Sequence, residues 1–157
     1  MIKLILTKPN KVEQTFLNSL KFSSKNLVGV LSTRPYSSFK PQFEKICTKK
    51  ECFFIDTLSE VKSDNSIYIN PENLTALSIA LSQAQQSMGD KVTIVFDSIN
   101  NLSIRNESSV LYKFFMFILN KAHDWQADIV LIAAEGGKDS SSLIDLIKQR
   151  ADKVEKR

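Results

Sequence analysis

Short apolar runs that alternate with amphipathic segments constrain the fold of this 157-residue chain more than any other feature of its sequence. Several runs, such as 27–31, lack the apolar–polar alternation of a half-exposed strand, which is typical of strands buried within a parallel sheet. The segments between the runs carry apolar residues at helical spacing. The runs that we expect to form strands are 2–6, 27–31, 52–55, 67–69, 92–96 and 129–134, with 153–155 beginning a last one.

Helices are expected between these strands, so that strand and helix alternate along the whole sequence. This order predicts an α/β fold of three layers, with a mostly parallel central sheet and helices on both of its faces. The helices are expected at 11–20, from Pro35 onward, at about 73–88 with Gly89 ending the helix, at 108–124 and at 140–151.

The expected helix at 108–124 carries aromatic residues on more than one of its faces. Phe114 and Phe117 should belong to the core, whereas Tyr112 and Phe115 should lie on the other side. Such a surplus of aromatic residues indicates an interface with a subunit or partner, unless the helix is buried on two sides.

The composition is that of a folded, water-soluble domain. Hydrophobic residues make up 43% of the sequence and charged residues 24%, which argues against disorder, and the apolar runs are too short to span a bilayer. We therefore expect one domain over 1–157 in the cytoplasm, with no membrane partner. Two cysteines, Cys47 and Cys52, lack the further ligands of a zinc site and are expected to be reduced thiols.

Positive charge is concentrated in the first third of the sequence. Residues 1–50 contain ten Lys or Arg and two Glu, a local excess of eight positive charges, against +4 for the whole chain. Such a segment can attract nucleic acid or an acidic protein surface, or it can be a set of hydrated lysines on exposed helix faces. Because no base-reading motif accompanies it, nucleic-acid binding would be weakly sequence-specific.

The residues just after the strands matter most for function, since ligands of parallel sheets bind at the carboxyl ends of the strands. Asp97 and Ser98 directly follow the apolar run 92–96. An aspartate at that point has the form of a Walker B segment, whose carboxylate holds Mg²⁺ beside a nucleotide phosphate. An aspartate that only ends a strand would have the same form.

Several segments in the same order resemble the archaeal RecA/KaiC-like P-loop ATPases, in particular their short, divergent members. VTIVFDSINNL (92–102) and the following VLYKFFMFILNKAH resemble the Walker B strand and the next helix. The resemblance covers roughly residues 2–155, and its other segments are NPENLTALSIALSQAQ and LIDLIKQRADKV. It implies that one further strand separates the first strand from the strand before Asp97.

The resemblance places a phosphate-binding loop of the form G-x-x-x-x-G-K-[ST] after the first strand. The sequence there is Lys8-Pro9-Asn10-Lys11-Val12-Glu13-Gln14-Thr15. Thr15 fits the hydroxyl position, but both glycines and the lysine of the motif are replaced. The family's acidic residue after the second strand is missing as well, because that strand is followed by Ser32, Thr33 and Arg34, and an arginine cannot act as a base.

A second stretch, Gly136-Gly137-Lys138-Asp139-Ser140, resembles a phosphate loop only in composition. Its spacing differs from that of a Walker A motif. Asp139 is better interpreted as the N-cap of the helix at 140–151.

The sequence therefore predicts a RecA/KaiC-like pseudo-ATPase with a degenerate Walker A, no catalytic residue and no required cofactor. It would act in regulation or signalling through a protein partner or as a homo-oligomer, for which an active RecA-like ATPase is one candidate partner. The alternatives are a divergent ATP-binding protein or ATPase, and a nucleic-acid binder. Residual Mg-ATP would be held by Lys8, Lys11, Gln14, Thr15, Arg34, Asp97 and Ser98, with Asp97 and Thr15 on the metal. Without nucleotide, Asp97 is expected to be structural and to hydrogen-bond Thr15 or the loop before it.

Overall fold

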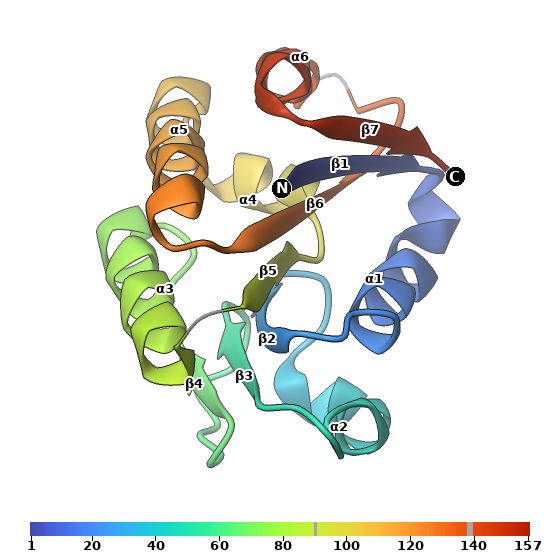
Figure 1. The fold of residues 1–157 in the computed structure, drawn as a ribbon. Coiled ribbons are helices and arrows are strands. Elements are labelled where there is room, and N and C mark those ends of the chain that lie inside the picture. Colours follow the sequence, from blue (N-terminus) through green and yellow to red (C-terminus); the bar gives the residue numbers. More distant parts are fainter. Residues whose placement is uncertain (90, 138–139) are drawn as a thin grey trace.

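The computed structural model describes residues 1–89, 91–137 and 140–157, and it contains a single seven-stranded sheet (Figure 1). All of its strand pairs are parallel, and their order is β4-β3-β2-β5-β6-β1-β7. The strands are β1 (Ile2–Thr7), β2 (Asn26–Leu31), β3 (Cys52–Asp56), β4 (Ser66–Tyr68), β5 (Val92–Phe96), β6 (Asp128–Ala134) and β7 (Lys153–Lys156).

Helices cover both faces of the sheet, which confirms the predicted three-layer α/β architecture (Figure 1). Two helices pack on one face and four on the other, with the apolar side chains of the strands pointing alternately into the two cores. The first pair is α1 (Val12–Lys21), preceded by the 3-10 turn η1 (Pro9–Lys11), and α2 (Tyr36–Ile46). The other four are α3 (Leu74–Met88), α4 (Ile99–Arg105), α5 (Ser108–Asp124) and α6 (Ser141–Arg150).

The strand order brings three connections to one edge of the sheet. β6 lies between β1 and β5, as the family resemblance implies, and β2 lies on the other side of β5. Because all these strands are parallel, the segments that follow β1, β2 and β5 emerge at the same edge. The topology therefore brings Thr15, Ser32 and Asp97 to the same edge of the sheet.

Two features of the helices differ from the expectations above, and one expectation is untested. α4 was not expected, because its seven residues are too few for a helical pattern to show in the sequence. In α5, Phe115 is buried, whereas the side chain of Phe117 is 46% exposed. The buried arc of α5 runs through Leu111, Phe115 and Leu119, on the side opposite Phe117. Asp139, expected as an N-cap, lies outside the described residues.

Cys47 and Cys52 form a disulfide bond, which corrects the expectation of reduced thiols. The bond closes the short connection between α2 and β3. Within that connection, Lys50 Nζ donates to the carbonyl oxygens of Leu20 and Ser23, at 2.7 and 2.6 Å. The loop thereby satisfies carbonyl groups at the carboxyl end of α1, where a positive charge is favourable. Burial lowers the pKa of Lys50.

Replacing both cysteines by serine is expected to lower the free energy of unfolding by about 2 kcal/mol, the value for a bond that closes so short a loop. Urea denaturation of the double variant and of the oxidised wild type measures this difference. The variant Lys50→Met separates the ammonium contacts from the covalent link. Equal stability of wild type and double variant would show that the loop is held without the disulfide.

Three cations surround Glu155 on β7, and one of them, Lys3, comes from the neighbouring strand β1. Its carboxylate lies 3.1 Å from Lys153 Nζ, 2.9 Å from Arg157 Nη2 and 3.5 Å from Lys3 Nζ. The hydrogen bond from Lys153, followed by that from Arg157, lowers the pKa of Glu155 from 4.5 to about 2. Since the pKa is lower in the folded state, the stabilisation is present above the unfolded pKa and is lost as the pH falls toward 2.

Glu155→Gln is accordingly expected to cost about 1 kcal/mol at pH 7, because solvent screens these partly exposed pairs. At pH 2 the cost should disappear. Denaturant curves at both pH values check this prediction, and an equal cost at both would assign the effect to packing instead of charge.

Candidate functional site

Asp97 lies at the shared edge of the sheet, directly after β5, and its side chain is buried. Both carboxylate oxygens accept hydrogen bonds from the segment that follows β2. Ser32 donates through its backbone N–H at 2.9 Å and through Oγ at 2.7 Å, and Thr33 donates through its backbone N–H at 3.0 Å and through Oγ1 at 2.8 Å. The carboxylate is thus enclosed by four donors of the protein itself.

These contacts correct the expected partner of Asp97. Among the described residues, no hydrogen bond joins Asp97 to Thr15 or to the segment before it. The partners are Ser32 and Thr33, at the position where the resembling ATPases carry an acidic residue. Burial raises the pKa of Asp97, and the hydrogen bonds from Ser32 and Thr33 oppose that rise. The donors are neutral dipoles, so they satisfy the oxygens without adding a cation.

The first turn of α4 ties this edge together further. Ser98 is the N-cap of α4 and accepts from the backbone N–H of Asn101 at 3.3 Å. Asn101 Nδ2 donates to the carbonyl oxygen of Ser32 at 2.9 Å. Asn100 accepts from the backbone N–H of Ala134 at 2.8 Å and donates to its carbonyl oxygen at 3.2 Å. α4 therefore links the ends of β2, β5 and β6.

The segment that follows β1 is helical almost from its start. Lys8 is extended and precedes η1, and its carbonyl oxygen accepts from the backbone N–H of Lys11 at 2.9 Å. α1 then begins at Val12. A phosphate-binding loop instead exposes a series of backbone N–H groups around the anion, with glycines allowing the necessary turns. In this chain the 3-10 turn η1 and the helix α1 follow β1 instead of such an open loop.

The predicted site residues in this segment do not converge on one site. Gln14 Nε2 donates to Asn18 Oδ1 along α1 at 2.9 Å. Thr15 is buried, and its carbonyl oxygen accepts from Ser19 Oγ at 2.9 Å. Lys8 and Lys11 are exposed. Thr7 Oγ1, at the end of β1, is buried without a hydrogen-bond partner among the described residues, but one hydroxyl is not a phosphate cradle.

Arg34 is brought to this edge but is paired with a side chain of the protein. Its Nε lies 3.3 Å from Glu13 Oε2, and both side chains are substantially exposed. If the family resemblance holds at this segment, Glu13 occupies the position of the second glycine of a Walker A motif and adds a negative charge there. The structure thus places Arg34 and Glu13 together as an ion pair.

The residues present at this edge do not fit Mg-ATP. The oxygens of Asp97 are occupied by four hydrogen bonds, and a magnesium ion that needs near-ideal octahedral oxygen geometry would have to displace them. The part of the chain that the structure describes contains no group of three or more His, Cys, Asp or Glu residues able to hold a metal ion. It also contains no helix long and apolar enough to cross a membrane.

Two solved structures of archaeal proteins superpose on this chain. A KaiC-like protein from Pyrococcus horikoshii superposes with a TM-score of 0.71 and 13% sequence identity, over 98% of this chain and 68% of the other. The chain has the RecA-like fold. The flagellar accessory protein FlaH from Methanocaldococcus jannaschii superposes with a TM-score of 0.60 and 14% identity, over 99% of this chain and 70% of the other. No family model matches the sequence of this RecA-like chain, and comparison with curated proteins gave no match.

Ser32 and Thr33 are the partners of Asp97 that sequence reasoning missed. Two successive hydroxyl residues after a buried strand could have indicated a hydrogen-bonded partner for Asp97, because such side chains can donate to a neighbouring carboxylate. Their pairing with Asp97 depends on β2 and β5 being adjacent, and this adjacency is a property of the sheet order, which local sequence does not report.

Proposed function

We propose that this RecA-like domain does not hydrolyse nucleotide and acts through association with protein, in regulation or signalling. The observation that carries the proposal is the enclosure of Asp97 by Ser32 and Thr33. In this arrangement the carboxylate joins two strand ends, which is a structural task. The segment 9–15 supports the same proposal, because it is helical and not an open phosphate-binding loop.

A thermal-shift titration with MgATP and MgADP tests the claim that this domain does not use nucleotide. We expect no change of melting temperature at millimolar nucleotide. A nucleotide that did bind would stabilise the folded state by about 2.7 kcal/mol at a hundredfold excess over its dissociation constant, and the melting temperature would rise. Asp97→Asn serves as the matched variant. A saturable shift in the wild type that Asp97→Asn abolishes would refute the proposal and favour a divergent ATP-binding protein.

The outer surface of α3 and α5 supports the proposed association with protein. Ile79 on α3 and Val110 and Phe117 on α5 are about half exposed, and α3 and α5 pack beside each other (Figure 1). α3 contains no charged residue between Leu74 and Met88. An uncharged helix face with exposed apolar side chains has the composition of an interface core. Two copies of the chain can join α3 to α3 without burying like charges.

Sedimentation of the purified protein over a range of concentrations tests self-association through this surface. Ile79→Lys, on the surface of α3 that two copies would share, should shift the equilibrium toward monomer by at least about tenfold, since a buried unpaired charge costs more than 1.4 kcal/mol. Val61→Lys, which changes an exposed apolar residue on the β3–β4 connection, is the control and should leave association unchanged. A wild type that stays monomeric, or an equal response of both variants, would contradict self-association here.

A further inference from the structure

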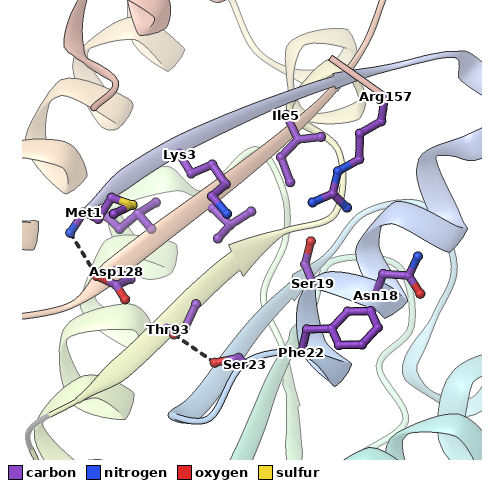
Figure 2. A pocket seen from close by; sticks show the side chains of 12 residues that line it. Met1, Lys3, Ile5, Asn18, Ser19, Phe22, Ser23, Thr93, Asp128 and Arg157 are labelled. Carbon is purple, nitrogen blue, oxygen red and sulfur yellow. Dashed lines mark hydrogen bonds and ion pairs between the residues drawn. The ribbon is translucent and has the colours of Figure 1, made fainter. Parts of the chain in front are cut away.

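A hollow lies at the opposite end of the strands from Asp97, between α1 and the amino-terminal halves of β1, β5 and β6 (Figure 2). Its volume is about 210 Å³, the space of roughly seven water molecules in the liquid. That volume suits a small organic molecule and is too small for a nucleotide. The hollow is independent of the proposed function, because it shares no residue with the edge that carries Asp97.

Two cationic side chains reach into this hollow from the sheet. Figure 2 shows Lys3 from β1 and Arg157, just after β7, extending toward α1. The carboxylate of Glu155 is shared by Lys3, Lys153 and Arg157, so three positive charges surround one negative charge. Arg157 gives one N–H each from Nε and Nη2 to Glu155. A guanidinium has five N–H donors, so donors remain for an anion in the hollow.

The other walls combine polar and apolar side chains. The polar ones are Asn18, Ser19, Ser23, Thr93 and Asp128, and the Asp128 carboxylate is paired with Lys25. Ile5 and Val130 form an apolar floor, where β1 and β6 run side by side. Phe22, at the carboxyl end of α1, lines the hollow with a side chain that is 77% exposed (Figure 2). An exposed aromatic ring beside an apolar floor offers a face on which a planar ligand can stack. A bare inorganic anion would leave both of these surfaces in contact with water.

We propose that this hollow binds a small aromatic carboxylate. The carboxylate accepts from Lys3 and Arg157, and the ring of the ligand lies between the apolar floor and Phe22. A small-molecule site combines apolar surface with a few polar groups that fix the orientation of the ligand. The cations at and around the hollow, which are Lys3, Lys25, Lys153 and Arg157, outnumber the carboxylates of Asp128 and Glu155, and this excess selects an anion. The floor selects an anion with an apolar body.

The test is a titration of the full chain with benzoate, followed through the backbone amide signals in two-dimensional NMR. We expect saturable shifts at residues of the hollow, with a dissociation constant of about 1 mM or below. Inorganic phosphate and benzyl alcohol, which lack the ring or the charge, should bind at least about tenfold more weakly. Equal binding of phosphate would reduce the hollow to a simple anion site, and equal binding of benzyl alcohol would show that charge plays no part; either result overturns the proposal.

Variants locate the binding. Lys3→Met removes the ammonium but keeps the side-chain length, and should weaken benzoate binding about tenfold. Phe22→Ser changes an exposed residue, so it should fold normally and still weaken binding severalfold. Lys45→Met, on the exposed side of α2, is the control for general charge and should bind benzoate as the wild type does. The proposal is wrong if no shifts saturate up to about 10 mM benzoate, or if Phe22→Ser binds as tightly as the wild type.

Discussion

Gly29→Ala is expected to destabilise the protein by about 3 kcal/mol, at the upper end of the range for overpacking a core. Gly29 lies in the centre of β2 and pairs with Phe54 of β3. A Cβ atom at this position would lie 2.7 Å from Phe54 Cδ1 and 2.8 Å from Cε1. The ring of Phe54 cannot move aside easily, because it stacks on Phe43 with ring centroids 3.9 Å apart. Glycine is thus the residue that lets this aromatic cluster close over β2.

A double-mutant cycle with Phe54→Leu tests the stated cause. Phe54→Leu alone should cost about 1 to 2 kcal/mol for the lost contacts. In the double variant the smaller side chain leaves room for the new methyl group, so the combined cost should fall below the sum of the two single costs by at least about 1 kcal/mol. Gly89→Ala is the comparison, since its Cβ would meet nothing within 4 Å and only its φ of +70° is unfavourable. Additive costs in the cycle would exclude the clash as the cause.

The alternation of strands and helices could be predicted from local sequence because each pattern repeats over several residues. The run at 92–96 became β5 and the segment 108–124 became α5 with the same bounds. α4 could not be predicted, since a helix of under two turns shows too little periodicity. The exposure of Phe117 was also missed, because the buried arc of a helix depends on which neighbours flank it, and α5 packs against α3, α6 and the sheet.

The candidate site was predictable in position but not in its contacts. That Asp97 ends a buried strand follows from the apolar run before it. Its partners follow only from the adjacency of β2 and β5, which places Ser32 and Thr33 across from it. The disulfide between Cys47 and Cys52 was missed for a related reason. The sequence shows the spacing of the cysteines, whereas the turn between α2 and β3 decides whether their sulfur atoms meet.

Asp97→Ala is expected to lower the free energy of unfolding by about 3 kcal/mol. The change removes the acceptor of two backbone N–H groups, those of Ser32 and Thr33, and of their two hydroxyls. Buried donors left without a partner cost about 1 to 3 kcal/mol each, although the hydroxyls can turn to other acceptors. Asp97→Asn keeps one acceptor oxygen and carries no charge to desolvate, so it should lose only about 1 kcal/mol. Urea denaturation of the three proteins measures both differences.

The pH dependence of the Asp97→Ala difference gives an independent check. Burial raises the pKa of Asp97 in the folded protein, so the native state binds this proton more tightly than the unfolded chain does. The stabilisation from the Asp97 side chain is therefore complete below the unfolded pKa and decreases as the pH rises through the folded pKa. We expect the gap between wild type and Asp97→Ala to be wider at pH 4 than at pH 7. Because the alanine variant lacks the titrating group, its own pH dependence is the reference against which that of the wild type is compared.

The sign of the Asp97→Ala effect also bears on the proposed function. A carboxylate kept for a metal and a nucleotide is costly to hold in the unliganded protein, so removing it tends to stabilise the fold at the expense of activity. A carboxylate that joins two strand ends has the opposite effect, because its removal leaves buried donors unpaired. Destabilisation by alanine, together with the absence of a nucleotide-induced thermal shift, would support a structural Asp97. An alanine variant more stable than the wild type would instead assign Asp97 to a ligand, and the proposal of a non-catalytic domain would fail.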